Sequence, residues 1–253
     1  MIVNCNIPSA SEYYYGAFYG SKFTRVTIGD SVTSIGDAAF SYCTSLTSVY
    51  ITDIAAWCNI SFGSYSSNPL YYAENLYLNN ELVTDLIIPD SVTSILGYAF
   101  SGCTSLTSIT IPDSVTSIGD NAFYNCTSLT SVTIPDSVTS IGNYAFYNCT
   151  SLTSVTIGNG VTSIGDRAFN GCTSLTSVTI GNGVTSIGEK AFYNCKSLKE
   201  VYCKPTTPPA GGLDMFYNNA SGRKIYVPRN SVEAYKAARG WSYYVPVIEG
   251  YDF

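Results

Sequence analysis

The chain has 253 residues and a formal net charge of −6, and only 12% of its residues are charged. With 22 Tyr and 11 Phe it does not have the composition of a disordered protein, because disordered chains are rich in charge and poor in aromatic residues. No basic stripe runs through it, so we expect neither a nucleic acid nor an anionic membrane surface as its partner.

The N-terminal residues 1–25 are rich in tyrosine and are expected to form a cap that contains one degenerate repeat. Their first part, MIVNCNIPSASEYYYG, has no apolar central region, so it is not predicted to be a signal peptide. No stretch approaches the ~20 apolar residues of a membrane span, and we expect no membrane insertion by this chain. The chain is then either cytoplasmic, or a mature form or fragment without its export signal.

Residues 26–203 repeat with a period of 23 residues. The isoleucine that ends SVTI and its equivalents marks the period, with one longer step of 37 residues, at Ile28, Ile51, Ile88, Ile111, Ile134, Ile157 and Ile180. Cys203 and Val227 continue this column and Ile7 precedes it, which predicts about ten rungs. Columns of Phe, Cys and Leu keep the same register.

Each repeat predicts a strand, a turn and a short helical turn. In LTSVTI, Val132 and Ile134 lie on one face of the strand and the hydroxyl residues on the other. PD or GNG then turns the chain, and GDNAFYNC is predicted to be a helical turn with Asp120 as its N-cap. Because one unit cannot bury its apolar side alone, the stacked units share one core. The predicted fold class is an α/β repeat solenoid, with a parallel strand ladder on one face and short helical turns on the other.

The longer step falls within residues 52–83, an insertion that breaks the repeat. Within it, LYLNNELV predicts a hairpin that turns at Asn79 and Asn80. Insertions in repeat proteins form loops that often lie on a binding face. We therefore take its Trp and Tyr residues as candidate binding residues, namely Trp57, Tyr65, Tyr71, Tyr72 and Tyr77. The alternative is that these aromatic side chains only pack the insertion onto the solenoid.

The outward positions of the predicted strands are Ser and Thr in the centre of the chain, with larger side chains only towards the two ends. Tyr50, Tyr202 and Tyr226 are among these larger residues. Tyrosine is favoured at binding hot spots, where Ser and Thr are under-represented, so we take the three tyrosines as further candidates. The alternative is that small hydroxyl residues simply suit closely spaced parallel strands.

Residues 204–253 are the other departure from the repeat. KPTTPPAGG is a connection rich in Pro and Gly, and NSVEAYKAARG predicts a helix with Asn230 or Ser231 as its N-cap and Gly240 just past its end. An open solenoid end exposes an apolar edge, so we expect this segment, which includes a degenerate repeat, to cap the stack.

The pattern L-x-x-V-x-I-P followed by I-G-x-x-A-F-x-x-C, at a period of 23 residues, resembles the BspA-type leucine-rich repeats of bacterial surface proteins. The resemblance covers residues 26–203 apart from the insertion, and the tail IYVPRNSVEAYKAARGW is similar to the C-terminal segment often found in such proteins. It implies a leucine-rich-repeat fold, display at the cell surface or secretion, and adhesion to host proteins or other cells.

The residues that catalysis usually needs are missing. The chain has no His, which removes Ser-His-Asp and Cys-His arrangements and the commonest metal ligand, and it has no glycine motif for phosphate or dinucleotide binding. We expect no enzyme activity, no cofactor and no metal. Asp90, Asp113 and Asp136 follow Pro in successive turns, and we interpret them as solvated turn residues rather than as a calcium site.

Nine Cys are present, and six of them lie in one column that aligns with the apolar core. We expect these six to form a ladder of buried thiols, since unpaired Cys is among the most buried residue types. Disulfides between neighbouring rungs are the alternative, because adjacent rungs bring the column within disulfide range.

Two functions fit the sequence. The repeat architecture, the aromatic insertion and the resemblance favour a non-enzymatic, surface or secreted recognition solenoid that binds a protein or glycan ligand. The near-identity of the central repeats favours a structural spacer or stalk that presents other domains. Indeed, Ile111–Thr133 and Ile134–Thr156 differ at only two positions, Asp120/Asn143 and Asn121/Tyr144. We expect a monomer in either case.

Overall fold

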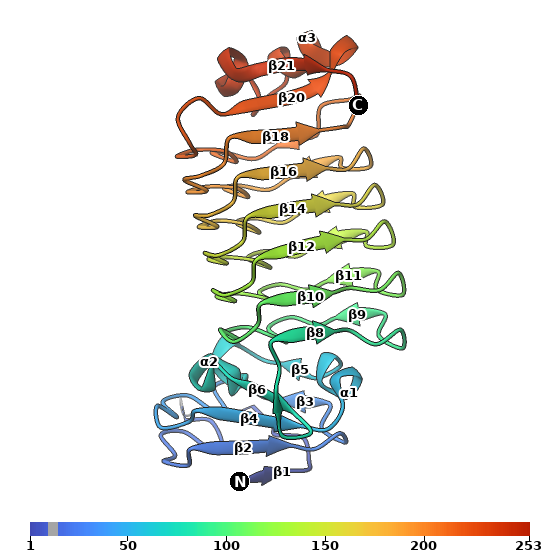
Figure 1. The fold of residues 1–253 in the computed structure, drawn as a ribbon. Helices are drawn as coiled ribbons and strands as arrows, with labels where there is room; N and C mark the ends of the chain where they lie inside the picture. The colour runs from blue at the N-terminus through green and yellow to red at the C-terminus, as the bar shows by residue number, and fades with distance from the viewer. Residues whose placement is uncertain (10–14) are drawn as a thin grey trace.

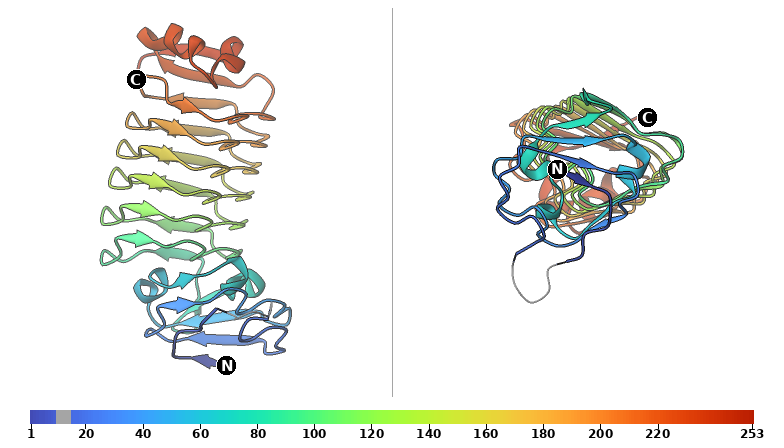
Figure 2. Two further views of the ribbon diagram at one scale, coloured as in Figure 1. Left: turned by 180° about the vertical axis from the view of Figure 1, so that it is seen from behind. Right: turned by 90° about the horizontal axis from the view of Figure 1, so that it is seen from below.

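Short strands from successive repeats stack into an elongated column with the two chain ends at opposite ends of it (Figure 1). The computed structural model describes residues 1–9 and 15–253. Seen along its axis, the column is a flattened tube in which successive turns of the chain superpose (Figure 2). Residues 10–14, part of the tyrosine-rich segment expected in the N-terminal cap, lie outside the described residues.

The SVTI stretches and their equivalents form the first ladder, in which each strand runs parallel to the next. Its strands are β1 (Ile2–Val3), β2 (Arg25–Ile28), β4 (Ser48–Ile51), β6 (Leu76–Leu78), β8 (Asp85–Ile87), β10 (Ser108–Thr110), β12 (Ser131–Ile134), β14 (Ser154–Ile157), β16 (Ser177–Ile180), β18 (Glu200–Cys203), β20 (Lys224–Pro228) and β21 (Ile248–Tyr251). The strands of this ladder fall into three sheets. The first holds β1, β2, β4 and β6, the second holds β8 and β10, and the third holds β12, β14, β16, β18, β20 and β21. The register places identical residues opposite each other, such as Val132 and Val155, so that apolar side chains point inwards on every rung.

Two-residue strands form a second ladder on the other side of the tube. They are β3 (Ser34–Ile35), β5 (Ser61–Phe62), β9 (Ser94–Ile95), β11 (Ser117–Ile118), β13 (Ser140–Ile141), β15 (Ser163–Ile164), β17 (Ser186–Ile187) and β19 (Ala210–Gly211). Figure 1 shows β9 and β11 behind β8 and β10. The core therefore lies between two parallel ladders, of which the sequence predicts only the first.

The stretch GDNAFYNC is not helical in the structure, which differs from the predicted short helical turn. Asn121 and Asn125 have φ angles of 57° and 58°, and this left-handed conformation cannot belong to a right-handed helix. Asp120 does not cap its own turn, because its Oδ1 accepts the N–H of Asn143 in the next rung, with N···O 2.6 Å. The residue before this turn is Gly in most rungs, at Gly36, Gly119, Gly142, Gly165 and Gly188, whereas Leu96 occupies the position in the rung of Tyr98. A Cβ on Gly119 would lie 2.6 Å from the Gly97 nitrogen.

Helices occur only in two segments of the described chain. The first segment holds α1 (Ile54–Cys58), η1 (Tyr65–Ser67) and α2 (Leu70–Ala73), and the second holds η2 (Arg229–Ser231), α3 (Val232–Ala237) and η3 (Ser242–Val247). The first segment ends in the predicted hairpin, in which β6 pairs with the antiparallel strand β7 (Glu81–Leu82). Asn79 and Asn80 at its tip have φ angles of 52° and 70°, as a two-residue hairpin turn requires.

The described residues contain twelve parallel strands in the first ladder, compared with the predicted ten or so. The extra rungs are β6 and β21, whose sequences do not follow the repeat. Leu78 of β6 lies next to Ile51 of β4, so part of the insertion is a rung of the stack. At the N-terminus, Val3 lies opposite Ile28, whereas Ile7 bridges to Ile35 of the second ladder and is not in the predicted column.

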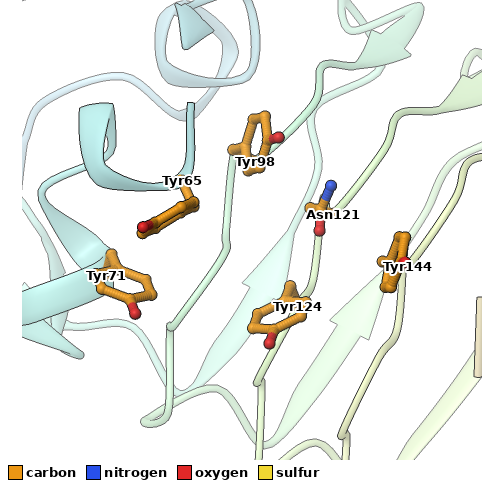
Figure 3. Close-up of a pocket in the computed structure, with 6 residues that line it drawn as sticks. All are labelled: Tyr65, Tyr71, Tyr98, Asn121, Tyr124 and Tyr144. Carbon is orange, nitrogen blue, oxygen red and sulfur yellow. The ribbon is translucent and has the colours of Figure 1, made fainter. Parts of the chain in front are cut away.

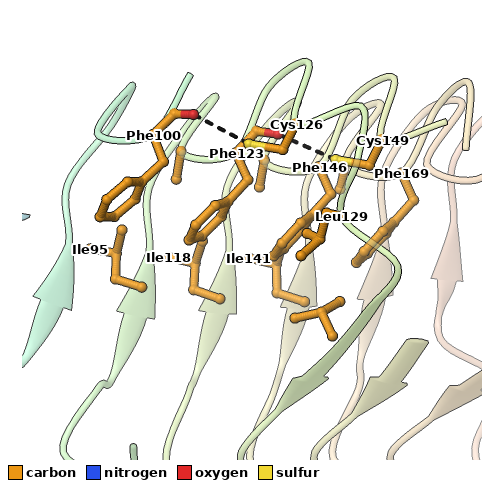
Figure 4. Close-up of a cluster of buried hydrophobic side chains, with 14 of the residues drawn as sticks. Ile95, Phe100, Ile118, Phe123, Cys126, Leu129, Ile141, Phe146, Cys149 and Phe169 are labelled. Carbon is orange, nitrogen blue, oxygen red and sulfur yellow. Dashed lines mark hydrogen bonds between the residues drawn. The ribbon is translucent and has the colours of Figure 1, made fainter. Parts of the chain in front are cut away.

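A row of phenylalanine rings runs through the core (Figure 4). The rings are fully buried and stacked with centroid separations of 5.1–5.4 Å, in the order Phe100, Phe123, Phe146, Phe169, Phe192 and Phe216. The Cys126 thiol donates to the Phe100 carbonyl oxygen at 3.2 Å, and Cys149 donates to Phe123 at 3.3 Å. All nine Cys are free thiols and only Cys5 is exposed, so the column forms the buried ladder that the sequence predicts.

The C-terminal segment adds β20, then forms α3, which lies at the end of the column, and finally returns as β21 to pair with β20 (Figure 1). Ser231 precedes α3 as predicted, but its Oγ donates to the Thr206 carbonyl at 2.7 Å and makes no capping bond. Trp241 is fully buried, and its Nε1 donates to the Pro209 carbonyl at 2.7 Å. Gly240 lies three residues past the end of α3, with a φ angle of 84°.

Candidate functional site

The structure separates the candidate binding residues into one core residue and three surface groups. Trp57 lies in the core. Tyr65, Tyr71 and Tyr72 lie on the turn side of the column, which we define as the side formed by GDNAFYNC and the equivalent turns. Two pairs lie on the outward face of the first ladder, Tyr50 with Tyr77 near one end and Tyr202 with Tyr226 near the other.

Trp57 is only 1% exposed, so the structure assigns it to the core rather than to a binding surface. Its Nε1 donates to the Ala99 carbonyl oxygen at 2.8 Å, and the buried Asn68 donates to the same oxygen at 3.1 Å. In the regular rungs the equivalent carbonyl, that of Ala122, accepts the backbone N–H of Phe100 from the preceding rung. Side chains of the insertion therefore replace a missing backbone donor and fix the insertion against the next rung.

An open pocket of about 420 Å³ lies where the insertion meets the regular turns (Figure 3). Tyr65 and Tyr71 form the insertion side of it. Three successive rungs supply the rest, with Tyr98 from the first, Asn121 and Tyr124 from the second, and Tyr144 from the third. Among the described residues, no charged side chain lines this tyrosine pocket. Its volume falls in the range of about 300–1,000 Å³ that is usual for ligand sites.

Neighbouring aromatic rings hold the tyrosines of the pocket in place. Tyr71 packs against Tyr65 with the ring centroids 4.9 Å apart, and edge-on against Tyr72 at 5.0 Å. Tyr124 stacks on Tyr147 at 5.0 Å, with the two rings within 4° of parallel. Tyr72 does not line the pocket but supports the ring of Tyr71, so contacts within the chain organise this wall of the pocket.

Two tyrosines of the pocket have raised pKa values. Burial raises the pKa of Tyr98 and of Tyr124, so both side chains stay protonated. The Tyr144 hydroxyl accepts a hydrogen bond from Nη1 of Arg167 at 2.7 Å, and Arg167 also pairs with Glu189 at 3.4 Å. The pocket thus presents neutral hydroxyl and amide groups beside aromatic rings.

Tyr98, Asn121 and Tyr144 occupy a turn position whose side chain varies from rung to rung and whose backbone is left-handed. Their φ angles are 65°, 57° and 56°, and Arg167 and Lys190 continue this variable column at 54° and 55°. A left-handed conformation costs roughly 1–2 kcal/mol for residues other than Gly, Asn and Asp. The other left-handed position of these five turns holds Asn or Gly, at Gly102, Asn125, Asn148, Gly171 and Asn194, although the first rung has Tyr42 at the equivalent position with a φ angle of 59°. A strained position that nevertheless keeps large side chains is a candidate functional position.

The sequence interpretation missed Tyr98, Asn121, Tyr124 and Tyr144. The difference between Asn121 and Tyr144 in two otherwise near-identical repeats is the signal that points to them, because a side chain that changes while its surroundings are constant faces solvent. Periodicity alone does not reveal that these turns lie beside the insertion.

The outward face of the first ladder carries an aromatic cluster near each end. Tyr50 and Tyr77 stack at 4.7 Å, and the Arg25 guanidinium lies 4.7 Å from the centroid of the Tyr50 ring. At the other end Tyr202 and Tyr226 stack at 5.0 Å. Tyr251 of β21, which the sequence interpretation also missed, packs against both of these rings.

The described residues contain no group of three or more His, Cys, Asp and Glu side chains that could hold a metal ion. Asp136 in the turn column instead accepts the N–H of Asn159 through Oδ1, with N···O 2.6 Å. Burial raises the pKa of Cys172 to about 12, and a thiol that stays protonated is a poor nucleophile. None of the helices in the described chain is long and apolar enough to cross a bilayer.

A column of parallel rungs with L-x-x-V-x-I strands defines a leucine-rich-repeat solenoid. The family model described as "BspA type Leucine rich repeat region (6 copies)" matches residues 2–70, 71–199 and 140–238. The chain therefore belongs to the BspA-type leucine-rich repeat family, as its repeat pattern predicts.

Solved structures of bacterial leucine-rich repeat proteins are similar to the chain. One from Eubacterium ventriosum has a TM-score of 0.54 at 19% identity, over 86% of this chain and 89% of that chain. A T. pallidum leucine-rich repeat protein is 28% identical over 78% of each chain, with a TM-score of 0.42. A leucine-rich cell surface protein from Faecalibacterium prausnitzii is 24% identical over 95% of this chain and 89% of that chain, with a TM-score of 0.37. No curated protein sequence matches the chain.

Proposed function

We propose that this protein is a non-enzymatic recognition and adhesion solenoid that acts at a cell surface or after secretion and binds a protein or glycan partner as a monomer. The tyrosine pocket is the observation that carries the proposal. Five tyrosines from the insertion and three rungs converge there on one recess, and tyrosine gives large, rigid contacts at a low entropic cost. The resemblance to repeats of bacterial surface proteins supports the location.

Tyr65 and Tyr71 are the primary contacts from the insertion in this proposal, with Tyr72 as their support. A protein partner would cover about 800 Å² on each side, which is more than one pocket provides. The two clusters on the strand face are therefore proposed as further contacts that only a larger partner reaches, through Tyr50 with Tyr77 and Tyr202 with Tyr226.

The absence of an enzyme activity is part of the proposal. The chain has no His, and the buried thiols have raised pKa values that keep them protonated. Tyrosine hydroxyls with raised pKa values are likewise poor general bases near neutral pH.

A spacer function has one specific observation in its favour. The strands β12, β14 and β16 have the same sequence, SVTI, so the centre of the strand face offers only Ser and Thr to a partner. A spacer would bind nothing through this chain, which separates the two functions experimentally.

The test is a binding screen of the chain against extracellular matrix proteins and against an array of glycans. A partner of the wild-type chain should no longer be retained by a variant that carries both Tyr71→Ala and Tyr124→Ala. Tyr243→Ala is the matched control, since Tyr243 is 76% exposed and lies outside the pocket. Absence of any partner would support the spacer, and equal binding by the double variant would reject the pocket as the site.

A further inference from the structure

We infer that the tyrosine pocket binds a neutral glycan chain, which lies along the axis of the column from Tyr71 across Asn121 to Tyr144. This inference rests on the proposed recognition function and names the chemical class of its partner. Four features of the pocket support it: the chemistry of the lining, the state of the backbone, the direction of the recess and its charge.

The lining matches the two surfaces of a sugar ring. A pyranose presents a face of C–H groups, which packs on aromatic rings, and a rim of hydroxyl groups, which hydrogen-bond. Figure 3 places the Asn121 side chain among the rings of Tyr98, Tyr124 and Tyr144. An amide both donates and accepts hydrogen bonds, as a phenol does, and sugar hydroxyls require partners of this kind.

The backbone along the pocket wall is already hydrogen-bonded within the stack. The N–H groups of Tyr98, Asn121 and Tyr144 donate to carbonyl oxygens of the following rung at 2.8–2.9 Å. A peptide partner that ran along this wall would find none of these three main-chain donors available to its own carbonyl groups. Side-chain hydroxyl and amide groups are then the main hydrogen-bonding groups that this wall offers, and the hydroxyl groups of a sugar suit them.

The recess extends along the column rather than around one point. Paired strands lie ~4.8 Å apart, so the three rungs from Tyr98 to Tyr144 cover roughly 10 Å along the axis. Adjacent residues of a glycan chain have a similar spacing, so neighbouring rungs can contact neighbouring sugars. An aromatic cage for a quaternary ammonium group instead needs its rings around a single centre.

The charges beside the pocket disfavour acidic sugars. Arg167 adjoins Tyr144, but it is already paired with Glu189, and Glu189 also binds Lys190 at 2.7 Å. A sulfated or uronic acid chain would lose hydration from its charges without gaining an unpaired cation from these residues. A neutral chain avoids that penalty.

The experiment is a glycan array that contains neutral, sialylated, sulfated and uronic acid chains, probed with the wild-type protein. We expect the bound glycans to be neutral, with the affinity of each then measured by calorimetry. Tyr71→Ala combined with Tyr124→Ala should weaken binding about tenfold or more, and Tyr243→Ala should leave it unchanged.

A second variant guards against loss of the local fold. Tyr71→Phe combined with Tyr124→Phe keeps both rings and removes both hydroxyl groups, so it should weaken the binding of neutral glycans without changing the melting temperature. Binding of acidic glycans alone, or neutral binding that both double variants preserve, would overturn the inference. So would a protein partner that binds through the same tyrosines without any glycan hit, although the recognition function would then stand. If the chain binds neither a glycan nor a protein, that result would contradict both the glycan inference and the recognition function.

Discussion

The central rungs and the insertion build the same column by different means. The strands β12, β14 and β16 each read SVTI, and hydrogen bonds recur at a separation of 23 residues. The insertion repeats nothing, yet Trp57 and Asn68 supply the hydrogen bonds that the Ala99 carbonyl would otherwise receive from a backbone N–H. The fold thus requires a donor at that carbonyl but not a particular sequence to provide it.

The surfaces of the two regions also differ, because the central rungs keep the repeat and the insertion breaks it. Where the repeat is kept, the strand face is a uniform layer of small hydroxyl residues, and the variable turn column carries larger side chains that differ from rung to rung. Where the repeat is broken, Tyr65 and Tyr71 project beside that column and create the pocket. The proposed recognition site therefore needs both regions, since the insertion supplies one wall and regular rungs supply the other.

The largest effect is expected when a buried ring is removed from the insertion or from a central rung. Comparing the two shows whether the insertion belongs to the core as fully as the central rungs do. Trp57→Ala and Phe146→Ala should each lower the free energy of unfolding by roughly 3–5 kcal/mol, because both rings are fully buried. Denaturant titration measures both. A loss below about 1 kcal/mol for Trp57→Ala alone would mean that the insertion is a dispensable surface loop.

The buried thiols should make both regions sensitive to alkaline pH. Burial raises the pKa of Cys58 in the insertion and of Cys172 in a regular rung from 9.0 to about 12. Their stabilising contribution is complete below pH 9, where the thiols of the unfolded chain are also protonated. It is lost as the pH rises from 9 towards 12. Unfolding curves measured at about pH 8 and about pH 10.5 give the drop in the free energy of unfolding between these two pH values. This drop should be smaller for Cys58→Ala and for Cys172→Ala than for the wild type.

Alkylation of the native protein near neutral pH gives the control for this prediction. Only Cys5 is exposed, so mass spectrometry should find it modified while the other thiols react only after denaturation. Rapid modification of Cys58 in the native state would show that the insertion opens more readily than the regular rungs.

A smaller effect is expected where one rung binds the next through a turn carboxylate. Asp120→Ala removes the acceptor of the Asn143 N–H and should lower the free energy of unfolding by about 1 kcal/mol. Asp113→Ala, at an exposed turn of the same repeat, is the control and should change it by less than about 0.5 kcal/mol. Equal losses for the two variants would show that the ladder of turn carboxylates contributes no specific stability.

The smallest effect concerns the variable column. Lys190→Asn places a residue that tolerates the left-handed conformation at a φ angle of 55°, and it should stabilise the fold by roughly 0.5 kcal/mol. Lys199→Asn, at an exposed position without such a φ angle, should not stabilise it. A drop in the melting temperature for Lys190→Asn would indicate that its pairing with Glu189 outweighs the strain.

The sequence predicts the first ladder and the core well, because Val132, Ile134, Phe146 and Cys149 each belong to a column that repeats every 23 residues. It does not predict the second ladder, since a two-residue Ser–Ile strand is too short to show an alternation. The helical turn is wrong because the left-handed backbone at Asn121 and Asn125 depends on hydrogen bonds to the next rung. These bonds are not encoded in any one repeat.

The candidate site was predictable only in part. Aromatic enrichment identifies Tyr65 and Tyr71, but it identifies Trp57 equally, and only the packing separates a buried ring from an exposed one. Tyr98 and Tyr124 belong to regular turns and become part of a pocket only because the insertion folds beside them. Such a contact joins a repeated segment to a unique one, so the repeat pattern of the sequence cannot predict it.

Side-chain footprinting with hydroxyl radicals tests the central claim most directly, with the chain measured alone and bound to a partner from the screen. The account predicts the strongest protection at Tyr71, Tyr124 and Tyr144, and little or none at the exposed control Tyr243. Protection of Tyr50 and Tyr77 or of Tyr202 and Tyr226, with the pocket tyrosines unchanged, would contradict it and place recognition on the strand face instead.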